Sequence, residues 1–402
     1  MLQTLARTVL LTTAFAASFA SSPAAQEPKT QDPVAPAAQH TTPAAERPLA
    51  RSLRPQLDEV LQKAFARSKL PAVTAAVSLD GNIIWASALG TRRRSDAGDA
   101  GPVTTSTRFQ AASISKPITA MAVIKLVAAG SLDLDKPIAE LPGGVTLPRA
   151  DGVGDTPLTL RHLLSHTGGT TVHGFPGYSP TATVPTLADV IAGKGNTDAV
   201  AIDSPVGKHF RYSGGGTCLV QQILVATQQK PFPQLMRELV LAPIGMSNSA
   251  YAQPLPKAQW DTVACAHNED GEPLAQRWNV YPEMAAAGLW TTPTDLLRAL
   301  LAMRASEEGK AGSLLPAKLA KEMLTVQNNA ERFGIGWMVR RQGTRWMFGH
   351  SGGNLGFLCD SRMATINGHE VGVVAMTNSQ QESWQTIVPA MFDTIRSAVA
   401  GK

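Results

Sequence analysis

Apolar and polar positions follow two different periods along the chain, one typical of helices and one of strands. Between Leu53 and Ser68, apolar residues recur at helical spacing, which predicts an amphipathic helix. Residues 72–90 instead carry two β-prone runs on either side of Asp80-Gly81, a dipeptide that favours tight hairpin turns. The first part of the folded chain is therefore expected to be a helix followed by a β-hairpin.

The middle of the chain, about residues 131–300, has the pattern of helices joined by Pro- and Gly-rich loops. A helix is also predicted just before it, from Ser113 to Ala129, with Pro117 near its start and Gly130 beyond its end. Four further segments have helical spacing: Leu158–Ser165, Leu219–Ala226, Phe232–Leu241 and Pro293–Met303.

The C-terminal part returns to strand-like sequence. Four runs rich in β-branched and aromatic residues are expected to be strands, with tight turns at Gln342-Gly343 and Asn367-Gly368; they are FGIGWMVRR, TRWMFGH, FLCDSRMATI and EVGVVAMTN. A last helix is predicted over Trp384–Val399, with Pro389 bending it.

Strands at both ends and helices between them predict an α+β (α/β) fold. We expect an antiparallel sheet built from the two ends of the folded region, flanked by helices, with a mostly helical lobe inserted. The α/β lobe would cover about residues 51–125 and 305–400, and the helical lobe about residues 126–304, within one domain over 51–400.

The first 50 residues have a different character. Arg7, a short uncharged run and small residues up to Ala25 are the layout of a secretory signal peptide over residues 1–25. A membrane anchor is the alternative, but the run falls short of the roughly 20 apolar residues that a spanning helix needs. Residues 26–50 are rich in Pro, Ala, Thr and Gln, which predicts a linker. We therefore expect a secreted or periplasmic protein without a membrane span.

Charge argues against a nucleic-acid partner. The net charge is +5, and the basic triplet Arg92 to Arg94 is followed at once by Asp96 and Asp99, so no sustained basic face is visible. Cys218, Cys265 and Cys359 are widely spaced, and we expect them to be small core residues. His162 and His166 have the spacing of two zinc ligands, but Leu163 stands where that motif needs its glutamate, so both are expected to be structural.

Ser113 and Lys116 lie one helical turn apart, in AASISKPIT, and so share a helix face. A serine hydroxyl becomes a nucleophile only when a neighbouring group takes its proton, and a desolvated lysine can do so. Taken alone, this spacing is common by chance, and a serine at a helix start is more often a cap. A second serine candidate is Ser351, in a Gly-x-Ser-x-Gly pattern with Asp360 and His369 downstream, but a strand-like run follows it where a nucleophile elbow requires a helix.

Several motifs in order nevertheless resemble the serine hydrolases of the penicillin-binding-protein and class C β-lactamase type, which include esterases and D-amino-acid peptidases. The resemblance runs from about Leu53 to Val399. It is carried by Ser113-Ile114-Ser115-Lys116, LLSHTGG, Tyr212-Ser213-Gly214, PIGM at 243–246, AAAGLWTTPTDLLRAL and His350-Ser351-Gly352.

The resemblance implies a role for each of these residues and no cofactor or metal. Ser113 would form the acyl-enzyme, and Lys116 and Tyr212 would handle its proton. The backbone N–H groups of Ser113 and Gly353 would form the oxyanion hole. The substrate-binding residues would be His350, Ser351, Gly352 and Gly214.

Two departures from the family pattern bear on the substrate. Gly214 stands where the tyrosine motif usually has an asparagine, and it has no side-chain amide to bind an acylamide group. His350 replaces a lysine by a group that is mostly neutral at pH 7. We therefore expect a small-molecule or peptide substrate with an ester or amide bond, cleaved by an esterase, amidase or D-residue peptidase, and not an efficient β-lactamase. The alternative is a catalytically silent protein of the same fold that binds a cell-wall peptide or another acyl ligand.

Overall fold

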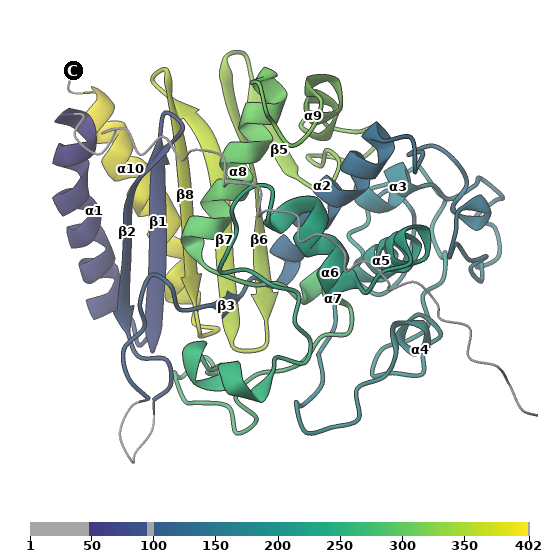
Figure 1. Ribbon diagram of the computed structural model, residues 1–402, viewed down its shortest axis with the longest axis horizontal. Helices are drawn as coiled ribbons and strands as arrows, with labels where there is room; N and C mark the ends of the chain where they lie inside the picture. The colour runs from purple at the N-terminus through teal and green to yellow at the C-terminus, as the bar shows by residue number, and fades with distance from the viewer. Residues whose placement is uncertain (1–47, 95–99, 401–402) are drawn as a thin grey trace, which may run out of the picture. The chain divides into compact units, whose positions relative to one another are not determined.

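The computed structural model of the 402-residue chain describes residues 48–94 and 100–400 (Figure 1). The predicted signal peptide over residues 1–25 lies outside the described residues. The predicted linker over 26–50 also lies outside them up to residue 47, and Pro48 to Ala50 already belong to the first helix, α1 (Pro48–Ala66).

A six-stranded antiparallel sheet, in the order β2-β1-β8-β7-β6-β5, is assembled from the two ends of this region (Figure 1). The strands are β1 (Ala72–Leu79), β2 (Asn82–Gly90), β5 (Met338–Gln342), β6 (Arg345–Asn354), β7 (Phe357–Ile366) and β8 (His369–Thr377). Because β1 pairs directly with β8, the N-terminal hairpin and the C-terminal strands form one sheet, as the sequence predicted.

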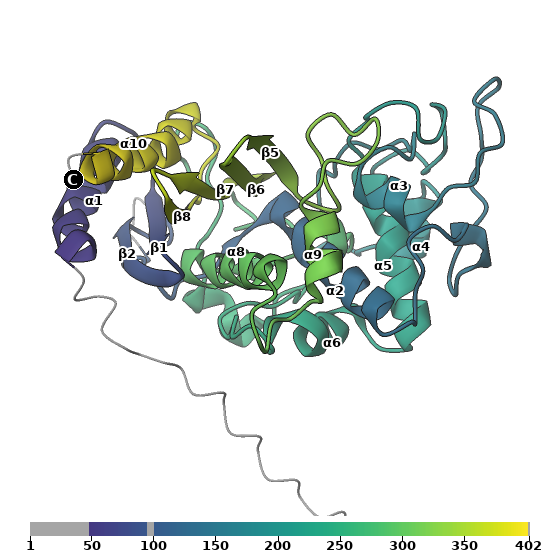
Figure 2. The ribbon, with the colours of Figure 1, turned by 90° about the horizontal axis from the view of Figure 1, so that it is seen from above.

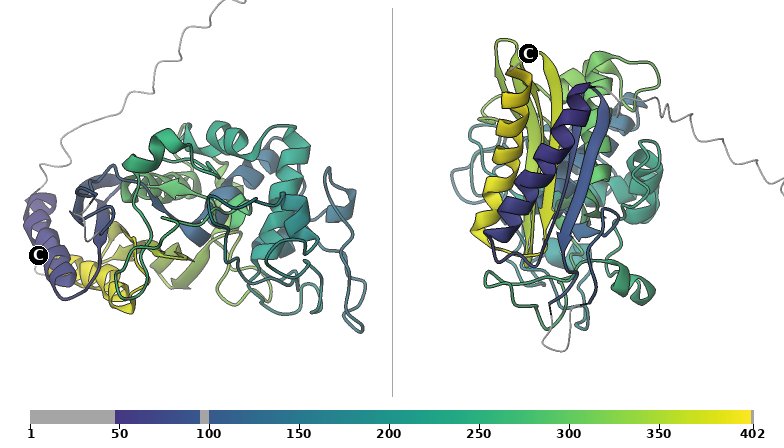
Figure 3. Two further views of the ribbon diagram at one scale, coloured as in Figure 1. Left: turned by 90° about the horizontal axis from the view of Figure 1, so that it is seen from below. Right: turned by 90° about the vertical axis from the view of Figure 1, so that its left-hand side faces the viewer.

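Helices cover both faces of the sheet (Figures 2 and 3). On one face α1 and α10 (Ile387–Ala400) lie side by side, and Leu53, Leu57 and Leu61 of α1 are fully buried there. Each such leucine stabilises the fold by roughly 1.5–3 kcal/mol. On the other face lies α8 (Pro293–Glu308).

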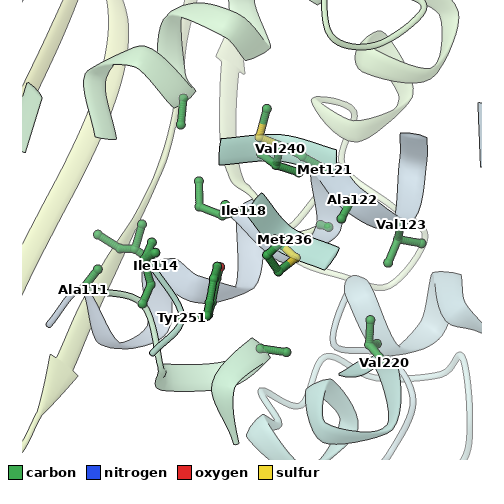
Figure 4. Close-up of a cluster of buried hydrophobic side chains, with 14 of the residues drawn as sticks. Ala111, Ile114, Ile118, Met121, Ala122, Val123, Val220, Met236, Val240 and Tyr251 are labelled. Carbon is green, nitrogen blue, oxygen red and sulfur yellow. The ribbon is translucent and has the colours of Figure 1, made fainter. Parts of the chain in front are cut away.

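The segment between β2 and α8 consists of helices, most of them short, joined by long loops, so it contains more loop than the sequence predicted. It surrounds one buried helix, α2 (Ser115–Ala128). Its apolar side chains pack against Val220, Met236, Val240 and Tyr251 of the surrounding elements (Figure 4). The other elements here are η2 (Ala112–Ile114), η3 (Ile138–Glu140), α3 (Leu160–Leu164), α4 (Leu187–Ile191), α5 (Gly214–Gln228), α6 (Phe232–Met236), η4 (Arg237–Leu241), η5 (Lys257–Thr262), α7 (Met284–Ala287) and the strand pair β3 (Phe109–Gln110) and β4 (Trp290–Thr291). After α8 follow α9 (Ala317–Met323) and η6 (Glu382–Thr386).

Several predicted boundaries are wrong, and two of them bear on the site. The strand expected from residue 333 begins only at Met338, because residues 333–337 leave the sheet and Gly336 packs against Ala120 of α2. The helix expected from Leu219 begins at Gly214, because the Ser213 side chain caps it by accepting a hydrogen bond from the Gly216 N–H.

The three cysteines are free and buried, in agreement with the expectation that they are core residues. Over residues 48–94 and 100–400, no helix has both the length and the apolarity required to cross a bilayer.

Candidate active site

Ser113 and Lys116 form a contact at the start of α2. The Lys116 Nζ donates to the Ser113 Oγ at 3.1 Å and to the Ala286 carbonyl oxygen, on α7, at 2.9 Å. Lys116 is only 5% exposed, whereas Ser113 is half-buried and can be reached by a ligand. A lysine amine held against a serine hydroxyl in a buried position is the arrangement that the sequence predicted for this pair.

The turn that carries Ser113 is held in an uncommon backbone conformation. Ala112 has φ of 49°, which costs a non-glycine residue of order 1–3 kcal/mol. Ser115 fixes this turn, since its hydroxyl donates to the Ala112 carbonyl at 2.6 Å and accepts from the Leu289 N–H at 3.0 Å. The Tyr251 hydroxyl donates to the Ser115 carbonyl at 3.0 Å. Hydrogen bonds from two other segments, at Leu289 and Tyr251, thus stabilise the turn that carries Ser113.

Tyr212 lies beside both Lys116 and His350. The centroid of its ring is 4.9 Å from the Lys116 Nζ and 6.2 Å from the centroid of the His350 ring. Three segments far apart in the sequence therefore bring Ser113, Lys116, Tyr212 and His350 together.

His166 lies in the active site, although the sequence analysis expected it only to be structural. Its ring packs on that of Tyr212 with centroids 4.2 Å apart, and its Nδ1 accepts the Ser213 N–H at 3.2 Å. Burial, and then the charge of Lys116, holds the pKa of His166 well below its usual range. His166 is consequently a neutral group that positions the Tyr212 segment, a structural role of the kind predicted.

The zinc arrangement of His162 and His166 is absent. The Nδ1 of His162 lies 3.0 Å from the Thr159 hydroxyl, away from the His166 contacts. In the described part of the chain, no three His, Cys, Asp or Glu side chains are grouped so that they could hold a metal ion.

The end of β6 forms a free edge of the sheet next to the nucleophile turn. Pairing with β5 stops at Gly349, so among the described strands residues 350–354 have no partner on that side. A Cβ on Gly352 would lie 2.2 Å from the Ala111 carbonyl oxygen and 3.0 Å from the Ser113 nitrogen. Only glycine lets β6 approach the turn this closely.

The register of β6 directs particular backbone groups to this edge. Asn354 and Phe357 close a two-residue hairpin loop and form a hydrogen-bonded pair, and every second residue of β6 repeats that pattern towards β7. Residues 350, 352 and 354 thus direct their N–H and C=O groups towards β7. The N–H and C=O groups of Ser351 and Gly353, which alternate with them, therefore point away from β7. Both Ser351 and Gly353 are exposed, and Gly352 is half-buried.

His350 is buried, with 4% of its surface exposed, beside Tyr212 and Lys116. Its Nδ1 donates to the Ser351 carbonyl at 2.5 Å, and its Nε2 has no hydrogen-bond partner among the described residues. Burial, and then the charge of Lys116, lowers the pKa of His350 to about 3. The imidazole is thus neutral at pH 7, as expected, and offers an acceptor at Nε2.

Gly214 does not line an open part of the site. It is buried, its N–H donates to the His173 carbonyl at 3.0 Å, and the Phe175 ring lies over it. His173 is exposed and its ring centroid is 5.0 Å from that of Tyr212. No motif in the sequence points to His173 and Phe175, which lie in a Pro- and Gly-rich loop.

The alternative nucleophile, Ser351, has none of the surroundings of a nucleophile elbow. The chain continues from β6 through a hairpin into β7, not into a helix. Asp360 is engaged by Arg362, and His369 lies with its Nδ1 2.9 Å from a carboxylate oxygen of Asp80.

Comparison with known proteins identifies the family of the chain. The family model described as Beta-lactamase matches residues 57–394. The esterase EstB of Burkholderia gladioli is 28% identical over 75% of this chain and 80% of its own length, and the D-alanyl-D-alanine-carboxypeptidase/endopeptidase AmpH of Escherichia coli K12 is 24% identical over 72% and 76%.

Solved structures share the fold. The D-amino acid amidase of Ochrobactrum anthropi SV3, crystallised with L-phenylalanine, superposes with a TM-score of 0.65 at 20% identity, over 86% of this chain and 99% of the amidase. The chain therefore belongs to the Beta-lactamase family and is a serine hydrolase of that family.

Proposed function

We propose that the protein hydrolyses an ester or amide bond through an acyl-enzyme on Ser113. The observation that carries this proposal is the 3.1 Å contact between the Ser113 hydroxyl and the buried Lys116 amine. A serine that shares its hydrogen bond with a desolvated amine can lose its proton as it attacks a carbonyl carbon.

In the proposed mechanism the Ser113 Oγ attacks the substrate carbonyl and its proton passes to the Lys116–Tyr212 pair. The developing oxyanion would accept hydrogen bonds from the backbone N–H groups of Ser113 and Gly353, and each such donor is worth roughly 2.7–4 kcal/mol. The leaving group then takes up the proton, and water releases the acyl group by the reverse sequence of transfers.

The proposed substrates are esters and D-residue amides, with β-lactams hydrolysed weakly. Support comes from the neutral His350, which supplies no fixed cation for a substrate carboxylate, and from Gly214, which has no amide to bind an acylamide. The relatives named as an esterase and as a D-alanyl-D-alanine carboxypeptidase are consistent with this range. We further propose export through residues 1–25, which N-terminal sequencing of the mature protein tests.

A panel of three substrates tests the proposed reaction: a p-nitrophenyl ester, a D-alanyl-D-alanine peptide and nitrocefin. We expect measurable kcat/KM on the ester or the peptide, far slower turnover of nitrocefin, and loss of all activity in Ser113→Ala. Ser131→Ala, a change at an exposed serine beyond the other end of α2, is the matched control and should keep normal rates. Folded protein that binds these compounds without turning over any of them would establish the silent binding protein instead.

A further inference from the structure

Next to Tyr212, the wall of the site is formed by residues 212–214, whose backbone is extended at Ser213. Ser213 has φ of −141° and ψ of 119°, so its neighbours Tyr212 and Gly214 face the same side, while Ser213 faces the other. The Ser213 hydroxyl accordingly points inward and donates to the Thr171 carbonyl at 2.7 Å. A side chain at position 214 would therefore enter the space that Tyr212 faces, beside Lys116.

Phe175 fills that space. A Cβ on Gly214 would lie 2.8 Å from the Phe175 Cε2 and 3.2 Å from the His173 carbonyl oxygen, so a larger residue fits only if the Phe175 ring moves. The backbone of Gly214 is not in the left-handed region, so this constraint is steric. Phe175 is itself half-exposed, which leaves part of its ring free to touch a ligand.

The loop holds Phe175 on both sides. Before it, the His173 carbonyl accepts the Gly214 N–H at 3.0 Å. After it, the Pro176 carbonyl accepts from the Asn279 side-chain amide at 2.8 Å. The backbone on either side of Phe175 is therefore anchored, which keeps the ring over Gly214, in the place where an amide side chain at position 214 would otherwise meet the substrate.

We propose that Phe175 is a substrate-contacting residue that selects an apolar acyl group, which makes the preferred substrates esters or amides of simple aliphatic or aromatic acids. This inference rests on the proposed function, since the acyl group is the part that stays on Ser113. A phenyl ring stabilises methylene groups by burying them, whereas an amide placed against it loses hydrogen bonds to water without replacement. Acyl groups with an acylamido substituent are accordingly disfavoured.

Two p-nitrophenyl esters of equal chain length test this selection: the pentanoate and the N-acetylglycinate, in which an amide replaces methylene groups. Each kcat/KM is divided by the uncatalysed rate of the same ester. We expect the wild type to prefer the pentanoate at least about tenfold, a difference of the size that pocket contacts produce. Phe175→Ala should lower this preference about tenfold, and Phe175→Leu, which stays apolar, should retain most of it.

Phe65→Ala is the control, because Phe65 is also half-buried but lies on α1, on the other side of the sheet; it should leave the preference unchanged. Labelling of Ser113 by a small fluorophosphonate, measured on every variant, reports an intact nucleophile. If Ser113 is labelled but Phe175→Ala keeps the wild-type preference, or if the wild type prefers the N-acetylglycinate, the selection by Phe175 is refuted while the proposed function stands. Absence of Ser113 labelling in the folded wild type refutes both.

Discussion

At the scale of single residues, the site is organised around one buried positive charge. Lys116 is 5% exposed, and its charge is among the causes that lower the pKa of both His166 and His350. Burial, together with this charge, keeps the two imidazoles neutral, so they can accept hydrogen bonds but do not compete with Lys116 as cations.

Removing the amine should disable the nucleophile without unfolding the protein. For Lys116→Ala we expect a loss of about 10²–10⁴ in kcat/KM on a p-nitrophenyl ester, the range of a lost proton-transfer group. Lys63→Ala, at an exposed position on α1, is the control, and thermal melts check the fold. A Lys116→Ala enzyme within a factor of about three of the wild type would take Lys116 out of the mechanism.

His350 should make the fold sensitive to acid. Its pKa in the folded state is about 3, below the ordinary 6.5, so the unfolded chain binds the extra proton and stability is lost as the pH falls from about 6.5 towards 3. In His350→Asn, melting temperatures measured between pH 7.5 and 4.5 should fall less steeply than those of the wild type. Parallel curves for the two proteins would contradict the lowered pKa.

Glu283 should make the stability of the fold depend on pH in the opposite direction. Its carboxyl group is buried, neither oxygen has a partner among the described residues, and burial raises its pKa from 4.5 to about 7. Folding is therefore penalised as the pH rises from about 4.5 through 7, by up to about 3 kcal/mol. Glu283→Gln should melt higher than the wild type at pH 8.5 and lose that advantage at pH 5; an advantage that is the same at both values would exclude this cause.

At the scale of elements, the close approach of the free edge of β6 to the nucleophile turn sets the site geometry. In Gly352→Ala the new methyl group would meet the Ala111 carbonyl at 2.2 Å, so β6 and the turn must separate. We expect kcat/KM to fall at least about 10²-fold, since misplacement by 1 Å has effects of that size.

Gly353→Ala is the comparison, because the nearest atom to its Cβ is the flexible end of Leu358, at 3.3 Å, and its N–H is retained. It should lose less activity than Gly352→Ala. Equal activity of the two variants would show that the close approach of β6 at Gly352 does not set the site geometry.

Local signals in the sequence were sufficient for some elements and not for others. The hairpin at Asp80-Gly81 and the pairing of Ser113 with Lys116 depend on residues at most a few positions apart, so turn chemistry and helical spacing predict them. His166 acts through Ser213, 47 positions away, and Phe175 acts by covering Gly214. Such contacts depend on how loops fold over helix ends, which periodicity does not describe.

At the scale of the whole molecule, the site depends on both ends of the folded chain. β1 pairs with β8, β8 with β7 and β7 with β6, and this series of strands holds the free edge of β6 next to the start of α2. The fold follows from this architecture and the family membership from the matching family model, whereas the identity of the nucleophile is a proposal that one experiment decides.

The most direct measurement is the mass of the intact protein after reaction with a fluorophosphonate, followed by peptide mapping. We predict one adduct per chain, located on Ser113, absent in Ser113→Ala and formed at least about 100-fold more slowly in Lys116→Ala. An adduct on Ser351 or on another residue, or labelling that persists unchanged in Ser113→Ala, would contradict the account.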